Sequence, residues 1–463
     1  MAKSENPPRG AAVAERFAQW ASALKDDAIP ASVRDTALRA LIDHAGLTVS
    51  ARGEPYVRAI VDTWDQAGPC TAFGHSTGFD MAGAALINGT AAHGEDYDDT
   101  FEGSPMHASA VVIPAVLAAG ERFGLSGADV LRGMVVGTEL MCRMAIVAPT
   151  AQHRAGFHPT AVAGALGAAA GVAAALRMKD SEITDALGIA GSFASGIIEY
   201  LAEGTWTKRI HPGWAAQSGI RAALLARGGF LGPRTVFEGE HGFFFAFGVG
   251  QIKPDMTRIT ADLGEDWHCG RIAFKPYACG TMVQPFIDCA VRLAGQGIPV
   301  DRIKSVLCKV GEGTVHRLWE PLTEKRRPTT PYSAKFSVPF GVAVGLLDRA
   351  AGLSQFTEER ITAADILDLT VKVSYEIDPA DEYPRNYTGT VIVTLDDGQK
   401  FEAHQPYLRG GVKETLEMEE ILTKFRANCA FGGWGADKAE ELAEAAADLF
   451  SAPDLGRLKA FRC

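Results

Sequence analysis

Hydrophobic positions recur every three or four residues through most of the first 250 residues, which is the spacing of one face of an α-helix. The pattern predicts helices over 30–45, 107–123, 127–147 and 160–178. The last of these contains glycines at 164, 167 and 171, where the absence of a side chain lets neighbouring backbones approach closely. We therefore expect a closely packed helical domain.

The pattern changes after Gly248, where apolar and polar residues begin to alternate as they do in a half-buried strand. Three runs predict strands: 306–310, 369–377 and 390–395. Asp397-Gly398 follows the third run and alternation then resumes, which predicts a hairpin. Between these strands, 285–295 and 337–351 have helical spacing.

Helical spacing returns from Glu414 onward, and 436–450 is rich in Ala, Glu and Leu. We expect a mainly α fold, with a large all-helical domain over 1–265 that is completed by the C-terminal helices in 411–463. A smaller α+β lid domain, 266–410, is inserted into it. A chain of 463 residues exceeds what one core usually supports. A cleft between two such domains is a common ligand site.

Composition and charge exclude several classes of partner. The net charge is -11 and no Lys/Arg-rich run is present, so nucleic acid is not expected. The apolar stretch 161–176 is short and mostly Ala and Gly, which predicts a buried helix and no membrane span. The eight cysteines form no C-x-x-C pair and residues 1–10 lack an apolar signal core. These features predict a reduced cytoplasmic protein without a zinc site.

The densest polar cluster runs from His93 through Asp96, Asp98 and Asp99 to Thr100, and His107 follows it. A simple interpretation is a solvated loop in which Asp99 or Thr100 caps a helix. Carboxylates and imidazoles at this density favour a functional site instead, although structural ion networks produce similar clusters.

Two further clusters are rich in basic side chains. His158 precedes Pro159, which suits the first position of a helix, so His158 would lie at the positive end of that helix, where a carboxylate binds. Lys208, Arg209 and His211 occur within four positions and are followed by Pro-Gly-Trp. Helix capping and surface charge are the alternative explanations.

A fourth cluster begins the inserted domain with Lys275, Tyr277 and Cys279, followed by Gly280. Lys275 could bind an anion and Tyr277 could transfer a proton, while core packing is the alternative for Tyr277 and Cys279. The chain contains no phosphate loop, G-x-S-x-G elbow or H-E-x-x-H helix. We therefore expect neither a nucleotide, flavin or nicotinamide cofactor nor a metal.

These four clusters, in this order, resemble the MmgE/PrpD family over nearly the whole chain. The most specific stretches are 88–93, 98–100 and 208–216. The resemblance implies a large helical domain and a smaller α+β lid with the site between them, no redox cofactor, and a homodimer. It also implies enzymatic action on small carboxylic acids. The family's active-site pattern carries over onto Asp96, Thr100, His107, His158 and Lys208.

From the clusters and the resemblance together we expect two groups of site residues. Catalytic roles are expected for His107, His158, Lys208, Asp96, Tyr277 and Cys279. Substrate contacts are expected for Thr100, Arg209, His211, Lys275 and Gln284. In this scheme an imidazole or ammonium removes a proton next to a carboxylate, and Asp96 orients a histidine and fixes its tautomer.

The chain departs from the family pattern after its Lys-Pro-Tyr motif. Thr281 stands where many relatives have Arg, and Gln284 stands where they have His. Gln is neither an acid nor a base near neutral pH. An epimerase needs no group to protonate a leaving hydroxyl, so we favour an epimerase of an aspartate-derived dicarboxylate such as iminodisuccinate. The alternatives are a hydro-lyase of the 2-methylcitrate dehydratase type and a decarboxylase of the cis-aconitate type.

Two hypotheses from other classes remain at this point. Asp98, Asp99 and Glu102 resemble the magnesium motif of helical prenyl-transfer enzymes, whose carboxylates share one helix face. No second acidic motif follows. A binding protein without catalytic activity is the other possibility.

Overall fold

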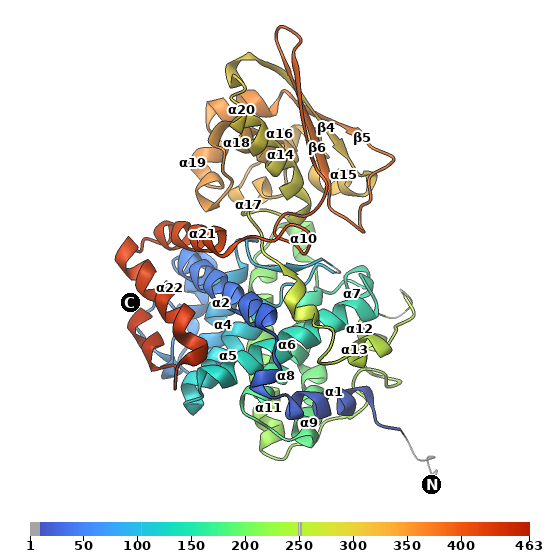
Figure 1. Cartoon of the computed structure of the whole chain (residues 1–463), viewed down its shortest axis with the longest axis vertical. Coiled ribbons are helices and arrows are strands. Elements are labelled where there is room, and N and C mark those ends of the chain that lie inside the picture. The colour runs from blue at the N-terminus through green and yellow to red at the C-terminus, as the bar shows by residue number, and fades with distance from the viewer. Residues whose placement is uncertain (1–9, 103, 249, 251) are drawn as a thin grey trace. The chain divides into compact units, whose positions relative to one another are not determined.

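The structure is a computed structural model that describes residues 10–102, 104–248, 250 and 252–463. It contains two compact units (Figure 1). The helical unit comprises Met1–Gly94, Asp99–Ile272 and Trp434–Cys463, and the α+β unit comprises Glu95–Asp98 and Ala273–Gly433. The expected fold class, mainly α with a smaller inserted α+β domain, is confirmed.

The observed unit boundaries lie later than the expected positions 265/266 and 410/411. Residues 266–272 belong to the helical unit because the short helix η2 (His268–Arg271) packs on its helices. The helix α21 (Met418–Phe431) belongs to the α+β unit, where it contacts η5 (Leu353–Gln355). The sequence pattern identifies helices but does not show which core each helix joins.

The helical unit is built mainly from helices of three to six turns. Its helices are α1 (Val13–Ala23), α2 (Ala31–Ala51), α3 (Pro55–Thr63), α4 (Met81–His93), α5 (Ser109–Phe123), α6 (Gly127–Val147), α7 (Ala151–Arg154), α8 (Pro159–Ala175), α9 (Asp180–Phe193), α10 (Tyr200–Glu203), α11 (Thr207–Arg227), α12 (Phe243–Gly248), α13 (Thr257–Thr260) and α22 (Ala436–Asp448). Three short strands are β1 (Ala67–Cys70), β2 (Thr100–Phe101) and β3 (Ile272–Ala273), the last at the junction of the units.

Helix α8 forms the centre of this unit, because all of its residues are buried and it packs on α5, α6, α9 and α11. Gly167 and Gly171 face Gly137 and Gly133 of α6, and an added Cβ at Gly171 would lie 2.8 Å from the Gly133 carbonyl oxygen. The predicted close packing at small residues is therefore confirmed. No helix within the described ranges is long and apolar enough to cross a membrane.

The α+β unit contains one four-stranded sheet in the order β5-β4-β6-β7. The strands are β4 (Ile303–Val310), β5 (Val373–Ile377), β6 (Gly389–Leu395) and β7 (Lys400–Gln405). β4 pairs parallel with β5 and antiparallel with β6, and β6 pairs antiparallel with β7 across the predicted Asp397-Gly398 turn. Gly398 has a φ of 87°, which this turn requires.

Helices cover this sheet and connect its strands. They are α14 (Gln284–Gly295), α15 (Glu312–Leu318), α16 (Leu322–Arg326), α17 (Pro331–Ala334), α18 (Val338–Asp348), α19 (Glu358–Ile361), α20 (Ala364–Thr370) and α21. α14 packs on β6, β7 and α18. The strand expected over 369–377 is wrong at its start, because Leu369 lies in α20, which ends at Thr370, and the strand begins at Val373. A buried helical face and a short strand share apolar spacing there, so alternation alone did not separate them.

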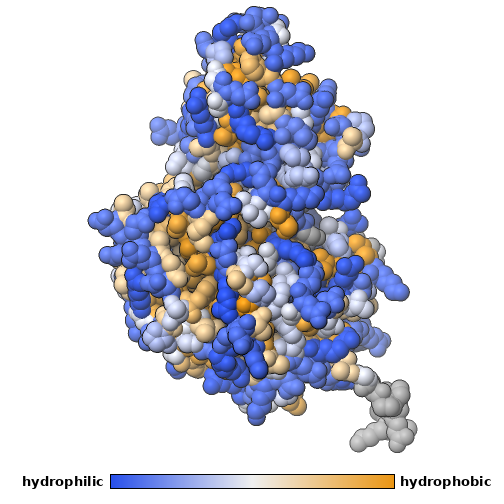
Figure 2. All heavy atoms as spheres, in the orientation of Figure 1, coloured by the Kyte–Doolittle hydropathy of each residue, from blue (hydrophilic) through white to orange (hydrophobic). Residues whose placement is uncertain are grey.

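Hydrophilic residues cover most of the surface that Figure 2 shows, and apolar residues form small groups between them. Seven of the eight cysteines are buried, and Cys463 is exposed. Burial raises the pKa of the Cys70 thiol to about 12. Buried thiols with raised pKa values are structural rather than reactive.

The contact between α4 and α11 gives a test of the fold. Gly213 of α11 lies against the backbone of α4, where an added Cβ would overlap the Leu86 carbonyl oxygen. We expect Gly213→Ala to lower the stability by about 1–3 kcal/mol through overpacking. The matched control is Gly295→Ala, because nothing lies within 4 Å of a Cβ added there. Thermal unfolding measures both variants, and equal melting temperatures would contradict the proposed helix contact.

Candidate functional site

Four histidines form a buried cluster in the helical unit. They are His93, His107, His158 and His211. Ring centroids lie 4.9 Å apart for His93 and His107, 5.7 Å for His93 and His158, and 5.3 Å for His158 and His211. Each ring comes from a different part of the chain, so only the folded unit brings them together. This histidine cluster is the candidate functional site.

His158 is positioned by the start of α8. It is the residue before the helix, and Pro159 occupies the first turn as predicted. Its backbone N–H donates to the Gly196 carbonyl at 2.9 Å. Gly196 has a φ of 128°, and a Cβ there would lie 3.3 Å from the His211 ring and press on Ala161. The glycine therefore leaves room for both imidazoles.

His107 is held by two hydrogen bonds. Its backbone N–H donates to Thr160 Oγ1 at 3.1 Å, and its Nδ1 lies 2.6 Å from the Asp99 carbonyl oxygen. A carbonyl only accepts, so Nδ1 carries the proton and Nε2 carries the lone pair in the neutral ring. We expected Asp96 to fix a histidine tautomer. For His107 the backbone of Asp99 does so.

His158 and His211 contact each other directly, with their Nδ1 atoms 3.1 Å apart. One of the two nitrogens must donate and the other accept, so two charged rings are incompatible with this contact. Burial and the nearby His93 lower the pKa of His211 to about 4. Burial, followed by His93, His211, Lys208 and His107, holds the pKa of His158 well below its usual range. Both rings are neutral at pH 7.

The basic side chains at the start of α11 lie in two different environments. The charge of Lys208 lowers the pKa of both His158 and His211, which indicates that its ammonium lies near the histidine cluster. The Arg209 guanidinium instead lies over the Tyr56 ring, 4.4 Å from its centroid, in a cation–π contact. Tyr200, which the sequence did not single out, lies 6.2 Å from His158 and 5.8 Å from His211 between ring centroids.

The segment Glu95–Asp98 belongs to the α+β unit, where three buried lysines hold its backbone. The ammonium of Lys335 donates to the Glu95 carbonyl at 2.7 Å, that of Lys275 to the Asp96 carbonyl at 2.9 Å, and that of Lys424 to the Tyr97 carbonyl at 2.7 Å. We call this set the lysine clamp. It fixes Asp96 in a left-handed conformation with a φ of 54°, which a non-glycine residue rarely adopts.

Lys275 and Asp96, both expected site residues, are thus in contact in the α+β unit. The Lys275 Nζ also lies 3.5 Å from Asp98 Oδ1. The other three expected residues of this unit have different surroundings. Tyr277 donates to Asp288 Oδ1 at 2.8 Å, and burial together with that carboxylate raises its pKa strongly. Cys279 is fully buried, and burial raises its pKa.

Gln284 begins α14 and is fully buried, and its amide atoms have no hydrogen-bond partner within the described residues. Thr100 is buried in β2 of the helical unit. The structure therefore brings together His107, His158, His211 and Lys208 in one unit and Asp96 and Lys275 in the other.

The magnesium hypothesis for Asp98, Asp99 and Glu102 is wrong in its geometry. The motif requires a helix, but Thr100 and Phe101 form the strand β2. The Asp99 carboxylate accepts from the backbone N–H of Ser109 at 3.2 Å and so pairs one of the free N–H groups at the start of α5. The N-cap residue of α5 is Ala108 and not Asp99. Asp98 pairs with Lys275.

Metal binding was not expected from the sequence. Within the helical unit, a nitrogen of His93 and one of His107 lie within 4.8 Å of each other. The geometry of the helical unit is suited to proton transfer and to binding of a carboxylate by neutral imidazoles beside an ammonium.

Several residues of the histidine cluster and the lysine clamp were not predicted from the sequence. His93 was named within the polar cluster but was not assigned a role, although it ends α4 and its ring lies against those of His107 and His158. Its position after an apolar helical run was the available signal. Tyr200, Lys335 and Lys424 are isolated in polar or mixed sequence, and no local pattern distinguishes them.

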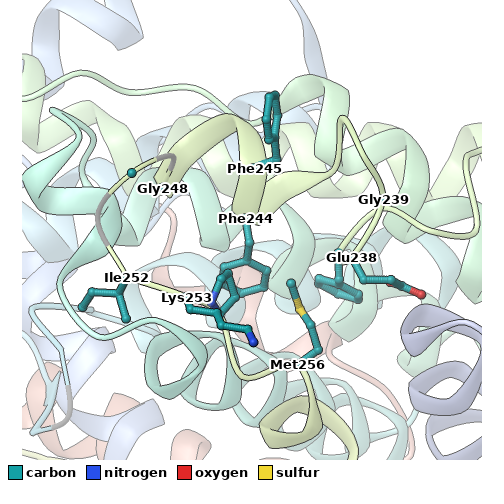
Figure 3. Close-up of a pocket in the computed structure, with 11 residues that line it drawn as sticks. Glu238, Gly239, Phe244, Phe245, Gly248, Ile252, Lys253 and Met256 are labelled. Carbon is teal, nitrogen blue, oxygen red and sulfur yellow. The ribbon is translucent and has the colours of Figure 1, made fainter.

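A large surface cavity of about 580 Å³ lies elsewhere in the helical unit and contains none of the expected site residues (Figure 3). Phe244 and Phe245 leave α12 in opposite directions, and Lys253 and Met256 line the cavity. Its walls are mainly apolar and lack the imidazoles of the histidine cluster. Cavity size therefore does not identify the candidate site here.

The fold and the histidine cluster define a mainly α-helical enzyme with a smaller α+β unit. A model of the MmgE/PrpD N-terminal domain matches residues 15–254, and a model of the MmgE/PrpD C-terminal domain matches residues 277–449. The chain belongs to the MmgE/PrpD family.

Curated relatives match along most of the chain. A cis-aconitate decarboxylase of Aspergillus terreus is 30% identical over 443 residues, which cover 89% of this chain and 88% of the relative. The cis-aconitate decarboxylase-like protein oryM of Aspergillus oryzae is 27% identical over 451 residues, which cover 92% of both chains. Human cis-aconitate decarboxylase is 30% identical over 361 residues, which cover 75% of this chain and 72% of the human protein.

The lowered pKa of His211 predicts how stability depends on pH. The unfolded ring has a pKa near 6.5 and the folded ring about 4, so the unfolded state binds more protons between these values. Stability is therefore lost as the pH falls from 6.5 towards 4. We expect the melting temperature to fall less between pH 7 and pH 5 in His211→Gln than in the wild type. The exposed control His241→Gln should follow the wild type, and identical pH dependence in all three would contradict the assignment.

Proposed function

We propose that this chain is a lyase that releases CO₂ from cis-aconitate or a closely similar unsaturated tricarboxylate. The observation that carries the proposal is the buried cluster of neutral imidazoles beside Lys208. The names of the relatives support the reaction class, because all three reported above are cis-aconitate decarboxylases or similar to one.

The reaction needs a place for an electron pair and a proton for carbon. When the bond between a CH₂ carbon and its carboxylate breaks, CO₂ leaves and the pair forms a new carbon–carbon double bond. The original double bond then supplies the electrons that bind a proton at the carbon next to a second carboxylate. The product is an unsaturated dicarboxylate, and the step consumes one proton and releases one CO₂. A site must therefore neutralise carboxylates and deliver one proton.

The helical unit has groups suited to both tasks. The Lys208 ammonium attracts a carboxylate of the substrate, and its charge is felt by His158 and His211. When anionic carboxylates replace water beside these rings, their negative charge raises the imidazole pKa. One ring then takes up the proton that the carbon receives. His107, with its proton fixed on Nδ1 by the Asp99 carbonyl, presents Nε2 as a hydrogen-bond acceptor or base.

None of the relatives reported above is named as an epimerase, whereas their names support the decarboxylase alternative. We favoured epimerisation because Gln284 stands in place of a histidine. A decarboxylation also proceeds without a departing hydroxyl, so the same substitution is compatible with CO₂ loss. The 2-methylcitrate dehydratase alternative requires a group that protonates a hydroxyl, and no observation of the histidine cluster favours it.

We expect the purified chain to convert cis-aconitate into an unsaturated dicarboxylate with release of CO₂. His158→Ala and Lys208→Ala should each lower kcat by at least about 100-fold, which is the lower range for loss of an acid–base group. Their melting temperatures should stay within a few degrees of the wild type. ¹³C NMR of labelled cis-aconitate in D₂O measures product, CO₂ and deuterium uptake together.

Matched controls in the same unit are His241→Ala and Lys253→Ala, whose residues lie outside the histidine cluster. Both should retain wild-type turnover. Deuterium exchange into a dicarboxylate without CO₂ release would instead favour the epimerase, and loss of water from a hydroxy acid would favour the dehydratase. Wild-type rates in both His158→Ala and Lys208→Ala would overturn the site assignment.

We also propose that the chain forms the homodimer that the family resemblance implied. Large apolar side chains are exposed over a short stretch of the helical unit: Phe193, Ile197, Leu201, Trp206 and Trp214. Exposed apolar groups of this size mark interaction surfaces in soluble proteins. A symmetric interface would cover the same residues on both copies.

Light scattering during size-exclusion chromatography should give about 98 kDa, twice the chain mass of 49.2 kDa. Trp214→Glu should shift the mass towards that of one chain, because it places a charge in the proposed interface. Val371→Glu changes an exposed apolar residue of the α+β unit and should leave the mass unchanged. A wild-type mass near 49 kDa would contradict the proposal.

A further inference from the structure

A second cavity of about 440 Å³ lies entirely among residues of the α+β unit. Helix α21 forms one wall, and residues 349–355, which follow α18, form another. Its volume is within the range of small-molecule sites. The histidine cluster contributes no residue to it. We call it the α21 cavity.

The apolar part of the α21 cavity comes from Leu353, Leu416 and Phe431. Leu353 and Leu416 are buried, while Phe431 is 40% exposed at the end of α21. Such walls favour a ligand with a hydrocarbon body, because burial of its apolar surface away from water is favourable.

The strongest sign of a ligand is Asn428, which lines the cavity and is only 2% exposed. Its amide Nδ2 has no hydrogen-bond partner within the described residues. A buried donor that stays unsatisfied destabilises the folded state. An acceptor atom of a bound molecule would remove this cost.

The charges around the α21 cavity indicate that this acceptor is anionic. Its lining has three cationic residues, Arg349, Arg409 and Lys424, against two acidic ones. Both acids are already in ion pairs, Glu420 with Arg409 and Glu419 with Arg426.

The remaining two cations have different surroundings. Arg349 is exposed and forms no ion pair within the described residues. The Lys424 ammonium donates to the Tyr97 carbonyl and lies 3.9 Å from the Tyr97 ring centroid. With three cationic and two acidic residues, the lining carries one more positive than negative charge.

We propose that the α21 cavity binds a small monocarboxylate with an apolar body. One carboxylate oxygen would accept from Asn428 Nδ2, and the charge would face Arg349 and Lys424. The hydrocarbon part would lie against Leu353 and Leu416. This site is independent of the proposed decarboxylation, since its occupancy is measured by binding and not by turnover.

The test uses hexanoate as the probe and hexanamide as its uncharged counterpart of the same shape. Ligand-observed NMR titration of the full chain gives a Kd for each. We expect saturable hexanoate binding and affinity for hexanamide that is at least about tenfold weaker, the loss that corresponds to about 1.4 kcal/mol. Asn428→Leu and Arg349→Gln should each weaken hexanoate binding by about three- to tenfold.

Two control variants separate this site from others. Lys413→Gln removes an exposed cation that lies over the Tyr407 ring, outside the α21 cavity, and should leave hexanoate binding unchanged. His158→Ala should also leave it unchanged, and loss of binding there would place the probe at the histidine cluster and overturn the proposal.

The proposal also fails if hexanoate shows no saturable binding, or if it binds equally well to the wild type, Asn428→Leu and Arg349→Gln. Arg349 is exposed at the end of α18, so its substitution keeps the test decisive even where Asn428→Leu fails to fold.

Discussion

The backbone contact between α4 and α11 is the constraint on which the histidine cluster depends. Gly89 and Gly213 meet without side chains, and a Cβ on Gly89 would lie 2.7 Å from the Gly213 Cα. His93 follows Gly89 by one helical turn, and His211 precedes Gly213 by two residues. The two glycines therefore bring two imidazoles from distant segments into one buried volume, and burial then lowers the pKa of His211. The close packing of these glycines therefore determines how deeply the imidazoles are buried and, through burial, their protonation state.

The lysine clamp has the corresponding role in the α+β unit. Three ammonium groups from separate elements bind three successive carbonyls of the segment Glu95–Asp98. Hydrogen bonds from charged donors are roughly twice as strong as neutral ones, so they stabilise the left-handed backbone of Asp96. A four-residue segment thereby joins the core of a unit that otherwise begins at Ala273. The α21 cavity shares Lys424 and Tyr97 with this clamp.

The sequence predicted long helices best because helical spacing persists over many residues, as in 127–147, which forms α6 with the same bounds. It predicted the Asp397-Gly398 hairpin because the turn needs glycine. It failed at 369–377, where two residues of the alternating pattern, Leu369 and Val371, belong to a helix and its end. Among site residues, His107, His158 and Lys208 were recognisable from local context. His93, Tyr200, Lys335 and Lys424 were not, because their roles depend on which segments the tertiary fold brings beside them.

The contact between His158 and His211 allows movement of protons in addition to their storage. The two Nδ1 atoms share a single hydrogen at 3.1 Å, so a proton that reaches the far nitrogen of one ring can displace the shared hydrogen toward the other ring. The second ring can then release a proton from its own far side. The contact therefore provides a path along which a proton can pass from one ring to the other while neither side chain changes its position.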